Sequence, residues 1–573
     1  MFRFRLKSGQ LPRFVALAKP YWNSAEKTRS RGLLALLILL LLGNTAFSVL
    51  LLEQSGELTS ALAARDSSRY WVSIYKTLGL FAVATPFYVL QYFVRDKLVN
   101  YWRRWLTHIY VGTYFRNKAF YKLAFNAEID NPDQRIAEDI DLFTIRSIFY
   151  SLLFVETVVQ LIAFSGVLWS ISKTLVLFLI VYATIGTLTA SLIFGRRLVT
   201  LNILQLRREA DFRFSLVRVR ENAESIAFYR GEEHESLYIK DRFREAYENR
   251  NMIINWQGVL NSFQYVYSSV TLVMPGLILL PQVLSGSIEV GRVVQASGAF
   301  AAIFTALTVI VNNFDTLSRF AAGISRLDKF AKALEVSATE SSLGRDVIQT
   351  IEGNRLALEH LTLQTPDYRR TLVKDLSLEI TSGESLLIVG ASGGGKSSLL
   401  RAIAGLWDSG SGKIVRPPLV EMFFLPQRPY MIIGTLRDQM LYPLTDAGIA
   451  DDQLHDVLKA VNLPDLVERC GGLDVHADWG KILSLGEQQR VAFARVLLSK
   501  PRYVILDEAT SALDSQNEES LYQQLQDSGA TLVSVSHRVN VVKFHKRILE
   551  IRGDESWRVT LAEESIMGHS ASR

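Results

Sequence analysis

Residues 385–400 read SLLIVGASGGGKSSLL and decide the fold of the C-terminal part of the chain. Ser385–Val389 is a short apolar run that predicts a buried strand, Gly390–Ser397 matches the pattern G-x-x-x-x-G-K-S, and a helix is predicted from Ser398. In this context the glycines let backbone N–H groups converge on phosphate oxygens, and the helix start adds positive potential. We expect Lys396 to reach the β- and γ-phosphates and Ser397 to offer its hydroxyl to Mg²⁺. The predicted phosphate-binding residues are Gly390, Ala391, Ser392, Gly393, Gly394, Gly395, Lys396, Ser397 and Ser398.

Two acidic residues follow a second buried strand, in YVILDEATSALD at 503–514. Asp507 is placed to hold Mg²⁺ through water, and Glu508 is placed to polarise an attacking water, because phosphoryl transfer depends on positioning and charge. The alternative is that both acids only cap the next helix. The upstream phosphate loop favours hydrolysis of a nucleotide.

A further phosphate site is predicted at LSLGEQQR, residues 483–490. Ser484 and Glu487 form an S-x-x-E capping box, so Ser484 and Gly486 lie at a helix N-terminus that can bind an anion. Either this is an idle cap, or it binds the same nucleotide from the other side. One domain cannot easily fold both sites around one ATP. Two copies placed head to tail can, with the Lys396 loop of one copy facing the Ser484 helix of the other.

The N-terminal 320 or so residues contain long apolar runs. Six of them reach the roughly 20 residues that cross a bilayer. They lie at about 32–52, 71–93, 147–170, 174–194, 257–282 and 292–313. The alternative, buried core helices of a soluble protein, is disfavoured by the length and leucine content of the first run. We therefore predict an all-α domain embedded in a lipid bilayer.

The basic residues indicate how these helices are oriented. The chain has 63 Lys and Arg against 57 Asp and Glu, which gives a net charge of +6. The residues before the first run and the two long connections are basic, whereas the short turns carry few Lys or Arg. By the positive-inside rule, both termini and both long connections face the cytosol. This distribution explains the basic charge without a nucleic-acid partner, and the single Cys470 excludes an internal disulfide.

Two polar features stand out in this half. In NPDQRIAEDI, residues 131–140, Asn131 is a good N-cap, and Arg135 can pair with Asp139 at i,i+4. Glu156 interrupts the third apolar run, where an ionisable residue usually faces a cavity or a partner. It either lines a substrate path, carries a proton or makes an interhelical hydrogen bond. Together with Asn44 and Asn312 it would form a polar cavity.

The C-terminal motifs occur in the order seen in ABC-transporter ATPase domains, and the chain from about 355 resembles that family. The resemblance rests on GASGGGKS, FLPQRPY, LSLGEQQR, VILDE, SALD and SVSHR. It implies that Gln427 senses Mg²⁺ and the membrane domain, that Glu508 is the catalytic base and that His537 contacts the γ-phosphate. Asp514 would communicate across a dimer. The usual adenine-stacking aromatic is replaced by Thr365, and Tyr368 is the expected substitute.

The membrane half resembles a narrower group through NPDQRIAEDI, YWRRWLT (Tyr101–Thr107) and READFRF. That group contains peroxisomal fatty-acyl-CoA ABC transporters and a bacterial set. The bacterial set includes importers of cobalamin and hydrophilic solutes with an exporter-like fold. It also includes peptide-antibiotic uptake proteins of the SbmA/BacA type that lack an ATPase.

These inferences define a multi-domain chain, an all-α six-helix transmembrane domain followed by an α/β P-loop ATPase. The expected parts are a basic cytosolic segment 1–31, a membrane domain 32–334, a linker 335–354 and an ATPase domain 355–573. We expect a homodimeric half-transporter that uses ATP and Mg²⁺ to move a small hydrophilic solute or peptide across the bacterial inner membrane by alternating access. The alternatives are an exporter or acyl-CoA transporter, and an ATP-gated channel or regulatory protein. A soluble ATPase acting on DNA or ribosomes is disfavoured by the six membrane segments.

Overall fold

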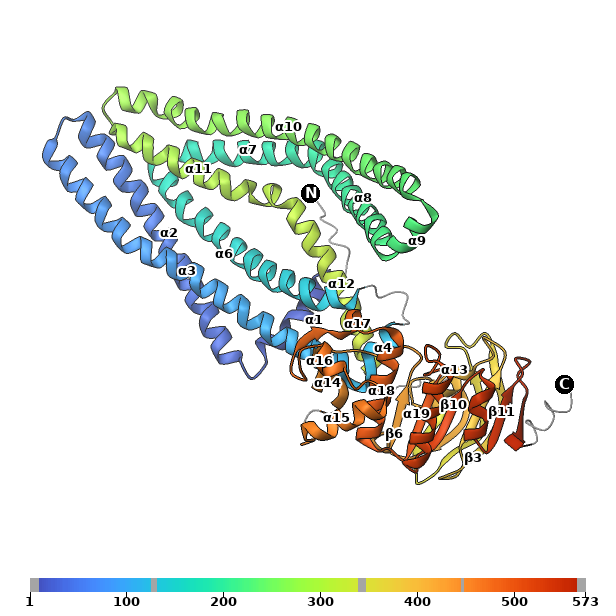
Figure 1. Cartoon of the computed structure of the whole chain (residues 1–573). Coiled ribbons are helices and arrows are strands. Elements are labelled where there is room, and N and C mark those ends of the chain that lie inside the picture. Colours follow the sequence, from blue (N-terminus) through green and yellow to red (C-terminus); the bar gives the residue numbers. More distant parts are fainter. Residues whose placement is uncertain (1–9, 125–130, 339–346, 445–447, 564–573) are drawn as a thin grey trace. The chain divides into compact units, whose positions relative to one another are not determined.

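The computed structural model describes residues 10–124, 131–338, 347–444 and 448–563. The chain divides into two compact units, Met1–Glu340 and Ser341–Arg573. The first unit is helical and the second is α/β (Figure 1). The helices of the first unit are α1 (Gln10–Trp22), α2 (Lys27–Ala63), α3 (Ser67–Phe115), α4 (Ala119–Ala124), α5 (Pro132–Gln134), α6 (Ile140–Ile171), α7 (Lys173–Ala190), α8 (Arg196–Glu221), α9 (Ala223–Tyr229), α10 (Glu232–Leu284), α11 (Val290–Asn312) and α12 (Phe314–Ala338).

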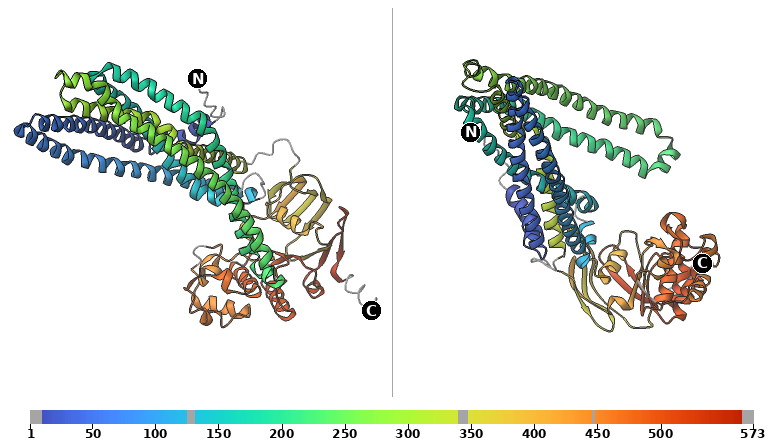
Figure 2. Two further views of the ribbon diagram at one scale, coloured as in Figure 1. Left: turned by 90° about the horizontal axis from the view of Figure 1, so that it is seen from above. Right: turned by 90° about the vertical axis from the view of Figure 1, so that its left-hand side faces the viewer.

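The described part of the first unit contains six helical spans long and apolar enough to cross a membrane, one for each predicted apolar run. Several continue well beyond the run that predicted them. The 53 residues of α10 would extend about 80 Å, roughly twice the thickness of a bilayer with its headgroups. In Figure 2, α8 and α10 form a long hairpin that diverges from α2 and α3. The described parts of the two long connections, which join the second run to the third and the fourth run to the fifth, are therefore largely helical.

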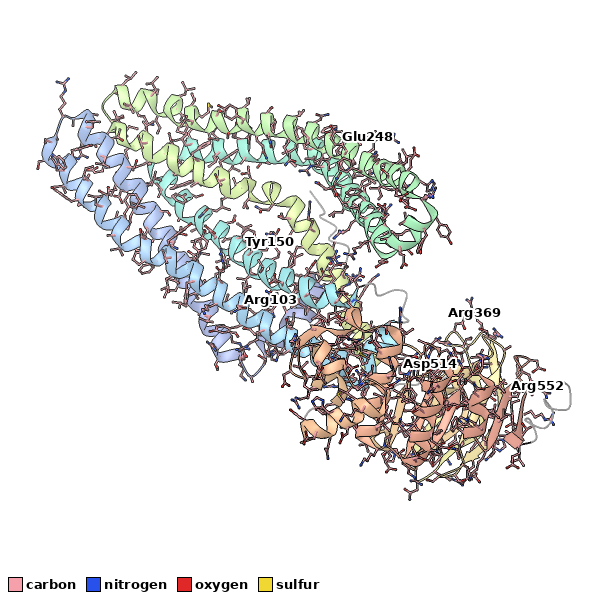
Figure 3. The ribbon with its side chains drawn as sticks, in the orientation of Figure 1. Arg103, Tyr150, Glu248, Arg369, Asp514 and Arg552 are labelled. Carbon is pink, nitrogen blue, oxygen red and sulfur yellow. The ribbon has the colours of Figure 1, made fainter. Side chains whose placement is uncertain are left out.

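The described part of the first unit has two apolar cores. The larger one joins α1, α2, α3, α4, α6 and α12, and the smaller one joins α6, α7, α10 and α11. The ring of Tyr21 on α1 stacks on that of Trp102 on α3, with centroids 5.4 Å apart. Thus the N-terminal segment, expected only to be basic and cytosolic, also supplies a helix to the core. Arg103 of α3, labelled in Figure 3, pairs with Asp141 of α6 at 3.1 Å.

The stretch 131–140 differs in detail from its prediction. The Arg135–Asp139 pair is confirmed, with Nη1 of Arg135 3.2 Å from Asp139. Asn131 takes a left-handed conformation (φ 43°) and its side chain makes no capping hydrogen bond, so the predicted N-cap bond is absent. Residues Arg135–Asp139 form a π-helical turn rather than an α-helix. Asp139 is buried there and also accepts two hydrogen bonds from Arg326 of α12, at 2.6 and 3.1 Å.

The described part of the second unit contains three sheets. Its strands are β1 (Gln349–Glu352), β2 (Leu356–Gln364), β3 (Thr371–Ile380), β4 (Leu386–Gly390), β5 (Gly410–Arg416), β6 (Met422–Leu425), β7 (Ile433–Thr435), β8 (His476–Asp478), β9 (Tyr503–Asp507), β10 (Thr531–Val535), β11 (Arg547–Ile551) and β12 (Trp557–Leu561). The strand orders are β1-β5-β2-β3, β12-β11-β4-β10-β9-β6 and β7-β8. Both the end of α12 and β1 lie inside the predicted linker 335–354.

The six-stranded sheet separates two cores. Its strands β11, β4, β10, β9 and β6 are parallel, and β12 is antiparallel at the edge. Because side chains alternate along a strand, Val504 and Leu506 of β9 enter one core, while Tyr503 and Ile505 enter the other. The helices of this unit are α13 (Lys396–Ile403), α14 (Leu436–Leu441), α15 (Asp451–Ala460), α16 (Leu466–Arg469), α17 (Trp479–Ile482), α18 (Leu485–Ser499) and α19 (Ser515–Asp527).

Candidate nucleotide site

The predicted site residues follow four neighbouring strands of the six-stranded sheet. The phosphate loop follows β4, and His537 follows β10. Asp507 is the last residue of β9 and Glu508 comes directly after it, while Gln427 follows β6. In the sheet these strands occur in the order β4-β10-β9-β6, and all four are parallel. Their carboxyl ends therefore meet at one edge, where open α/β sheets bind ligands. Residues far apart in the sequence are thus brought together by strand order.

The phosphate loop has a conformation that only glycine suits at its start. Gly390 has φ 141°, and a Cβ atom there would lie 2.0 Å from the carbonyl oxygen of Ile551 on β11. Lys396 begins α13, two residues before the predicted helix start, and its ammonium donates to the carbonyls of Gly390 and Ala391 at 2.8 and 2.9 Å. Burial lowers the pKa of Lys396, and the charges of Glu508 and Asp507 oppose this shift.

The next residue of the loop reaches the end of β9. Ser397 Oγ donates a hydrogen bond to Asp507 Oδ1 at 2.9 Å. Burial raises the pKa of the Asp507 carboxyl, and the hydrogen bond from Ser397 opposes the shift. A hydroxyl and a carboxylate at this distance are oxygen ligands of the kind that Mg²⁺ prefers. The residues present therefore fit a bound Mg²⁺ beside the phosphate loop.

Glu508 lies between the two other predicted catalytic residues. Gln427 Nε2 donates to Glu508 Oε2 at 3.3 Å, and His537 Nε2 lies 3.5 Å from Glu508 Oε1. Glu508 itself has a left-handed backbone (φ 49°), held by its N–H bond to the carbonyl of Val535 at 3.1 Å. A side chain positioned this way, with both carboxylate oxygens turned toward polar neighbours, is suited to orient an attacking water.

The helix N-terminus at LSLGEQQR has the predicted capping box. Ser484 Oγ accepts from the Glu487 N–H, and the Ser484 N–H donates to Glu487 Oε2 at 2.9 Å. Burial raises the pKa of Glu487, but hydrogen bonds from Ser484 and Arg469 outweigh it and hold that pKa below its ordinary value. Within the described part of the chain, no hydrogen bond of Ser484 reaches the phosphate loop.

The remaining predicted residues lie elsewhere on this unit. Asp514, labelled in Figure 3, caps α19 and accepts from the Asn517 N–H at 2.8 Å. Gly486 lies close to the same segment, since a Cβ there would be 3.2 Å from the carbonyl of Ala512. Tyr368 lies in the turn between β2 and β3, with a left-handed backbone (φ 58°).

Arg538, next to His537, is a contributor that the sequence analysis missed. Its guanidinium donates to the carbonyls of Leu513 and Ser511 at 2.8 and 3.0 Å, and to buried Glu518 at 3.2 Å. It thereby ties the end of β10 to the SALD segment. The only signal in the sequence was its position next to His537, which does not reveal a partner in a segment this far upstream.

The second unit combines a strand–loop–helix phosphate site with a positioned carboxylate, and the described residues of the first supply six spans for a membrane. Together they define the class of ATP-hydrolysing membrane transporters. A family model described as "ABC transporter transmembrane region 2" matches residues 17–283, and one described as "ABC transporter" matches residues 373–511.

Relatives cover almost the whole chain. An uncharacterized ABC transporter ATP-binding protein of Synechocystis sp. is 45% identical over 92% of this chain and 81% of its own length. ABC transporter D family member 2, chloroplastic, of Arabidopsis thaliana is 38% identical over 97% of this chain and 89% of its own. The lysosomal cobalamin transporter ABCD4 of Mus musculus is 31% identical over 97% of both.

A solved structure shows the same fold. The structure of a bacterial Atm1-family ABC exporter with ATP bound gives a TM-score of 0.73 at 18% identity, over 95% of this chain and 98% of that one. The chain belongs to the ABC transporter family, as a half-transporter of the D family. It is an integral multi-pass membrane protein with an ATP-binding and ATP-hydrolysing domain, and as a half-transporter it requires a dimer partner.

Proposed function

We propose that the protein is a homodimeric, ATP-driven pump that moves a small hydrophilic solute or peptide across the bacterial inner membrane by alternating access. The observation that carries the proposal is the placement of Glu508 between Gln427 and His537, directly after the strand that supplies Asp507. An intact hydrolytic group favours a pump over an ATP-gated channel, because gating does not require turnover. The functional domains proposed are 32–334 and 355–573, joined by 335–354.

In this pump the residues of the phosphate loop, 390–398, hold the triphosphate through backbone N–H groups. Lys396 would exchange its bonds to the Gly390 and Ala391 carbonyls for bonds to the phosphates. Ser397 and Asp507, with Gln427, would hold Mg²⁺, which would neutralise phosphate charge when bound. Glu508 orients the attacking water and accepts its proton, and His537 contacts the γ-phosphate. Tyr368 is the proposed stacking partner of adenine.

The homodimer is supported by the capping box at Ser484. The positive end of α18, where this box lies, is suited to bind an anion, yet within the described residues no hydrogen bond of Ser484 reaches the phosphate loop of its own chain. Placed head to tail, each chain would close the ATP site of the other with Ser484, Gly486 and Glu487. Asp514, at the segment that Gly486 approaches, would transmit the state of one site to the other.

The hydrophilic cargo and the membrane are supported by four further facts. The relative from Mus musculus is named a cobalamin transporter, and the Synechocystis relative is bacterial. The basic residues concentrate at the chain start and in the long connections, which by the positive-inside rule supports a cytosolic side for both termini. Asn44 and Glu156, predicted to share a polar cavity, line one cavity of the first unit, while the Asn312 side chain lies outside the described part.

The test is ATP-dependent movement of labelled solute in sealed vesicles of both orientations, for the wild type and Glu508→Gln. The solutes are cobalamin, a proline-rich peptide and a long-chain acyl-CoA. Movement of cobalamin or peptide that requires ATP and is lost in Glu508→Gln is expected. Movement of acyl-CoA alone would show that the cargo is not a hydrophilic solute or peptide. Movement that is unaffected by Glu508→Gln would refute ATP-driven pumping.

A further inference from the structure

The first unit holds a polar cavity of ≈ 260 Å³ whose walls come from three membrane-spanning helices, α2, α3 and α6. These helices lie side by side in Figures 1 and 2. Each contributes one face: the lining residues of α2, α3 and α6 recur at spacings of three and four, as on one side of a helix. Most of the lining is polar, which is costly in a membrane domain and indicates a functional surface.

The polar walls of the cavity are organised by short-range hydrogen bonds. Asn44 of α2 donates to Gln91 of α3, and Tyr88 donates to Tyr92 at 2.9 Å one turn apart on α3. On α6, Gln160 Nε2 donates to Glu156 Oε1 at 3.0 Å. These bonds hold the amide and phenol groups in place around the cavity. They leave the two charged residues of the lining, Arg95 and Glu156, incompletely partnered.

Glu156 presents an unused carboxylate oxygen. Gln160 occupies Oε1, and within the described part of the chain no hydrogen bond or ion pair engages Oε2. Arg95 presents the opposite charge. Its Nε donates to the exposed carboxylate of Asp96 at 2.9 Å, and its guanidinium lies over the ring of Tyr92, 4.5 Å from the centroid. Neither Nη atom of Arg95 donates a hydrogen bond to any residue that the structure describes.

The two charges do not pair with each other, although they line the same cavity. Buried or half-buried opposite charges in a membrane normally pair, because each is costly alone. A ligand with one positive and one negative group would satisfy both at once. A guanidinium with two free Nη atoms matches a carboxylate in bidentate geometry, and a carboxylate oxygen matches an ammonium. A volume of ≈ 260 Å³ is enough for the charged end of a solute.

We propose that this cavity binds a zwitterionic group of the cargo, with its carboxylate on the Nη atoms of Arg95 and its ammonium on Oε2 of Glu156. The cargo class is thus amino-acid-like, such as a short peptide with free ends. This inference rests on the proposed function, because it treats the cavity as part of the transport path. Two residues then set the preference for cargo: Arg95 binds its carboxylate and Glu156 binds its amine.

The test measures binding alone, to nucleotide-free protein in lipid nanodiscs. Labelled dialanine is the probe, and its competitors are unlabelled dialanine, N-acetyl-dialanine, which lacks the amine, and dialanine amide, which lacks the carboxylate. Each blocked form should compete roughly tenfold to a hundredfold more weakly than dialanine, the usual worth of a hydrogen bond to a charged group. Equal competition by all three would overturn the proposal.

The variants assign each charge to one end of the probe. Glu156→Gln should erase the preference for dialanine over N-acetyl-dialanine, and Arg95→Gln should erase the preference over dialanine amide. Because these substitutions also weaken the binding of dialanine itself, competition in these variants is measured with an excess of labelled dialanine. Glu156→Asp and Arg95→Lys keep the charges and should keep both preferences, which separates recognition from a folding defect. Lys97→Gln, on α3 outside the cavity, is the matched control.

Preferences that persist in Glu156→Gln or Arg95→Gln would also overturn the site. Because the assay contains no ATP, its outcome is independent of pumping. Selective binding without ATP-driven transport would refute the proposed function and leave the site standing. ATP-driven transport without selective binding would refute the site and leave the proposed function standing.

Discussion

Replacing Glu508 by Gln tests the hydrolytic role directly, because the change removes a charge and almost nothing else. The side chains have the same shape, and the amide oxygen of the new side chain can still accept the hydrogen bond that Gln427 donates at 3.3 Å. The amide cannot accept a proton from water. Loss of a positioned base costs about 10² to 10⁴ in rate, or roughly 2.7–5.5 kcal/mol of transition-state stabilisation.

The assay is steady-state release of phosphate by the purified dimer in nanodiscs, with binding of a fluorescent ATP analogue measured in parallel. We expect the rate to fall by that factor while the affinity for the analogue changes less than about threefold, because the residues of the phosphate loop are untouched. Glu384→Gln, an exposed acid that precedes β4 and pairs weakly with Arg547 at 3.8 Å, is the control and should keep the wild-type rate. A Glu508→Gln variant that retains more than about a tenth of the wild-type rate would refute the role of Glu508 as base.

Three other changes test the ATPase unit. Gly390→Ala should weaken binding of the ATP analogue at least tenfold, because its Cβ would lie 2.0 Å from the Ile551 oxygen, whereas Gly480→Ala, with its nearest atom at 3.6 Å, should bind normally; equal binding would contradict the loop geometry. Ser484→Ala should lower the stability of the first turn of α18 by about 1 kcal/mol and speed hydrogen exchange there roughly fivefold. Unchanged exchange would show that the cap does not stabilise the helix. Burial lowers the pKa of His545 to about 4. Between about pH 6.5 and 4 the unfolded chain therefore binds a proton at this residue that the native chain does not bind. The stability of the native chain is consequently lost as the pH falls through this window. Between pH 7 and 5 the loss should be about 2 kcal/mol in hydrogen exchange of β10, after correction for intrinsic rates, and a loss of the same size in His545→Gln would exclude this histidine.

The second unit was predictable to the level of its motifs, because each motif is a local pattern with local physics. A glycine-rich loop between a strand and a helix, and a capping box at Ser484, are encoded within a few residues, and both are found in the structure. The strand order that places β10 between β4 and β9 is not local, and no pattern in the sequence gives it. The contact of His537 with Glu508 depends on that order; the family resemblance implied a catalytic role for each residue but not that the two side chains meet.

The first unit was predictable in the number of its spans, since about twenty apolar residues are a sufficient signal for each. Polar contacts between helices were not predictable. The pairing of Asp139 with Arg326 joins residues 187 positions apart, and the sequence suggested only the local partner Arg135. Asn131 was expected to cap a helix because of its residue type and its place before the helix, but it has a left-handed backbone and its side chain makes no capping hydrogen bond.

The central claim is that each ATP site is completed by the partner chain, and a mixed dimer tests it most directly. Chains carrying Lys396→Ala and chains carrying Ser484→Arg are given different affinity tags, co-expressed, and the mixed dimer is isolated through both tags. If Lys396 of one chain works with Ser484 of the other, the mixed dimer keeps one intact site of two and should hydrolyse ATP at up to about half the wild-type rate, while each parent homodimer is inactive. If each chain closes its own site, the mixed dimer has none intact, and hydrolysis no faster than in the two parents would contradict the account.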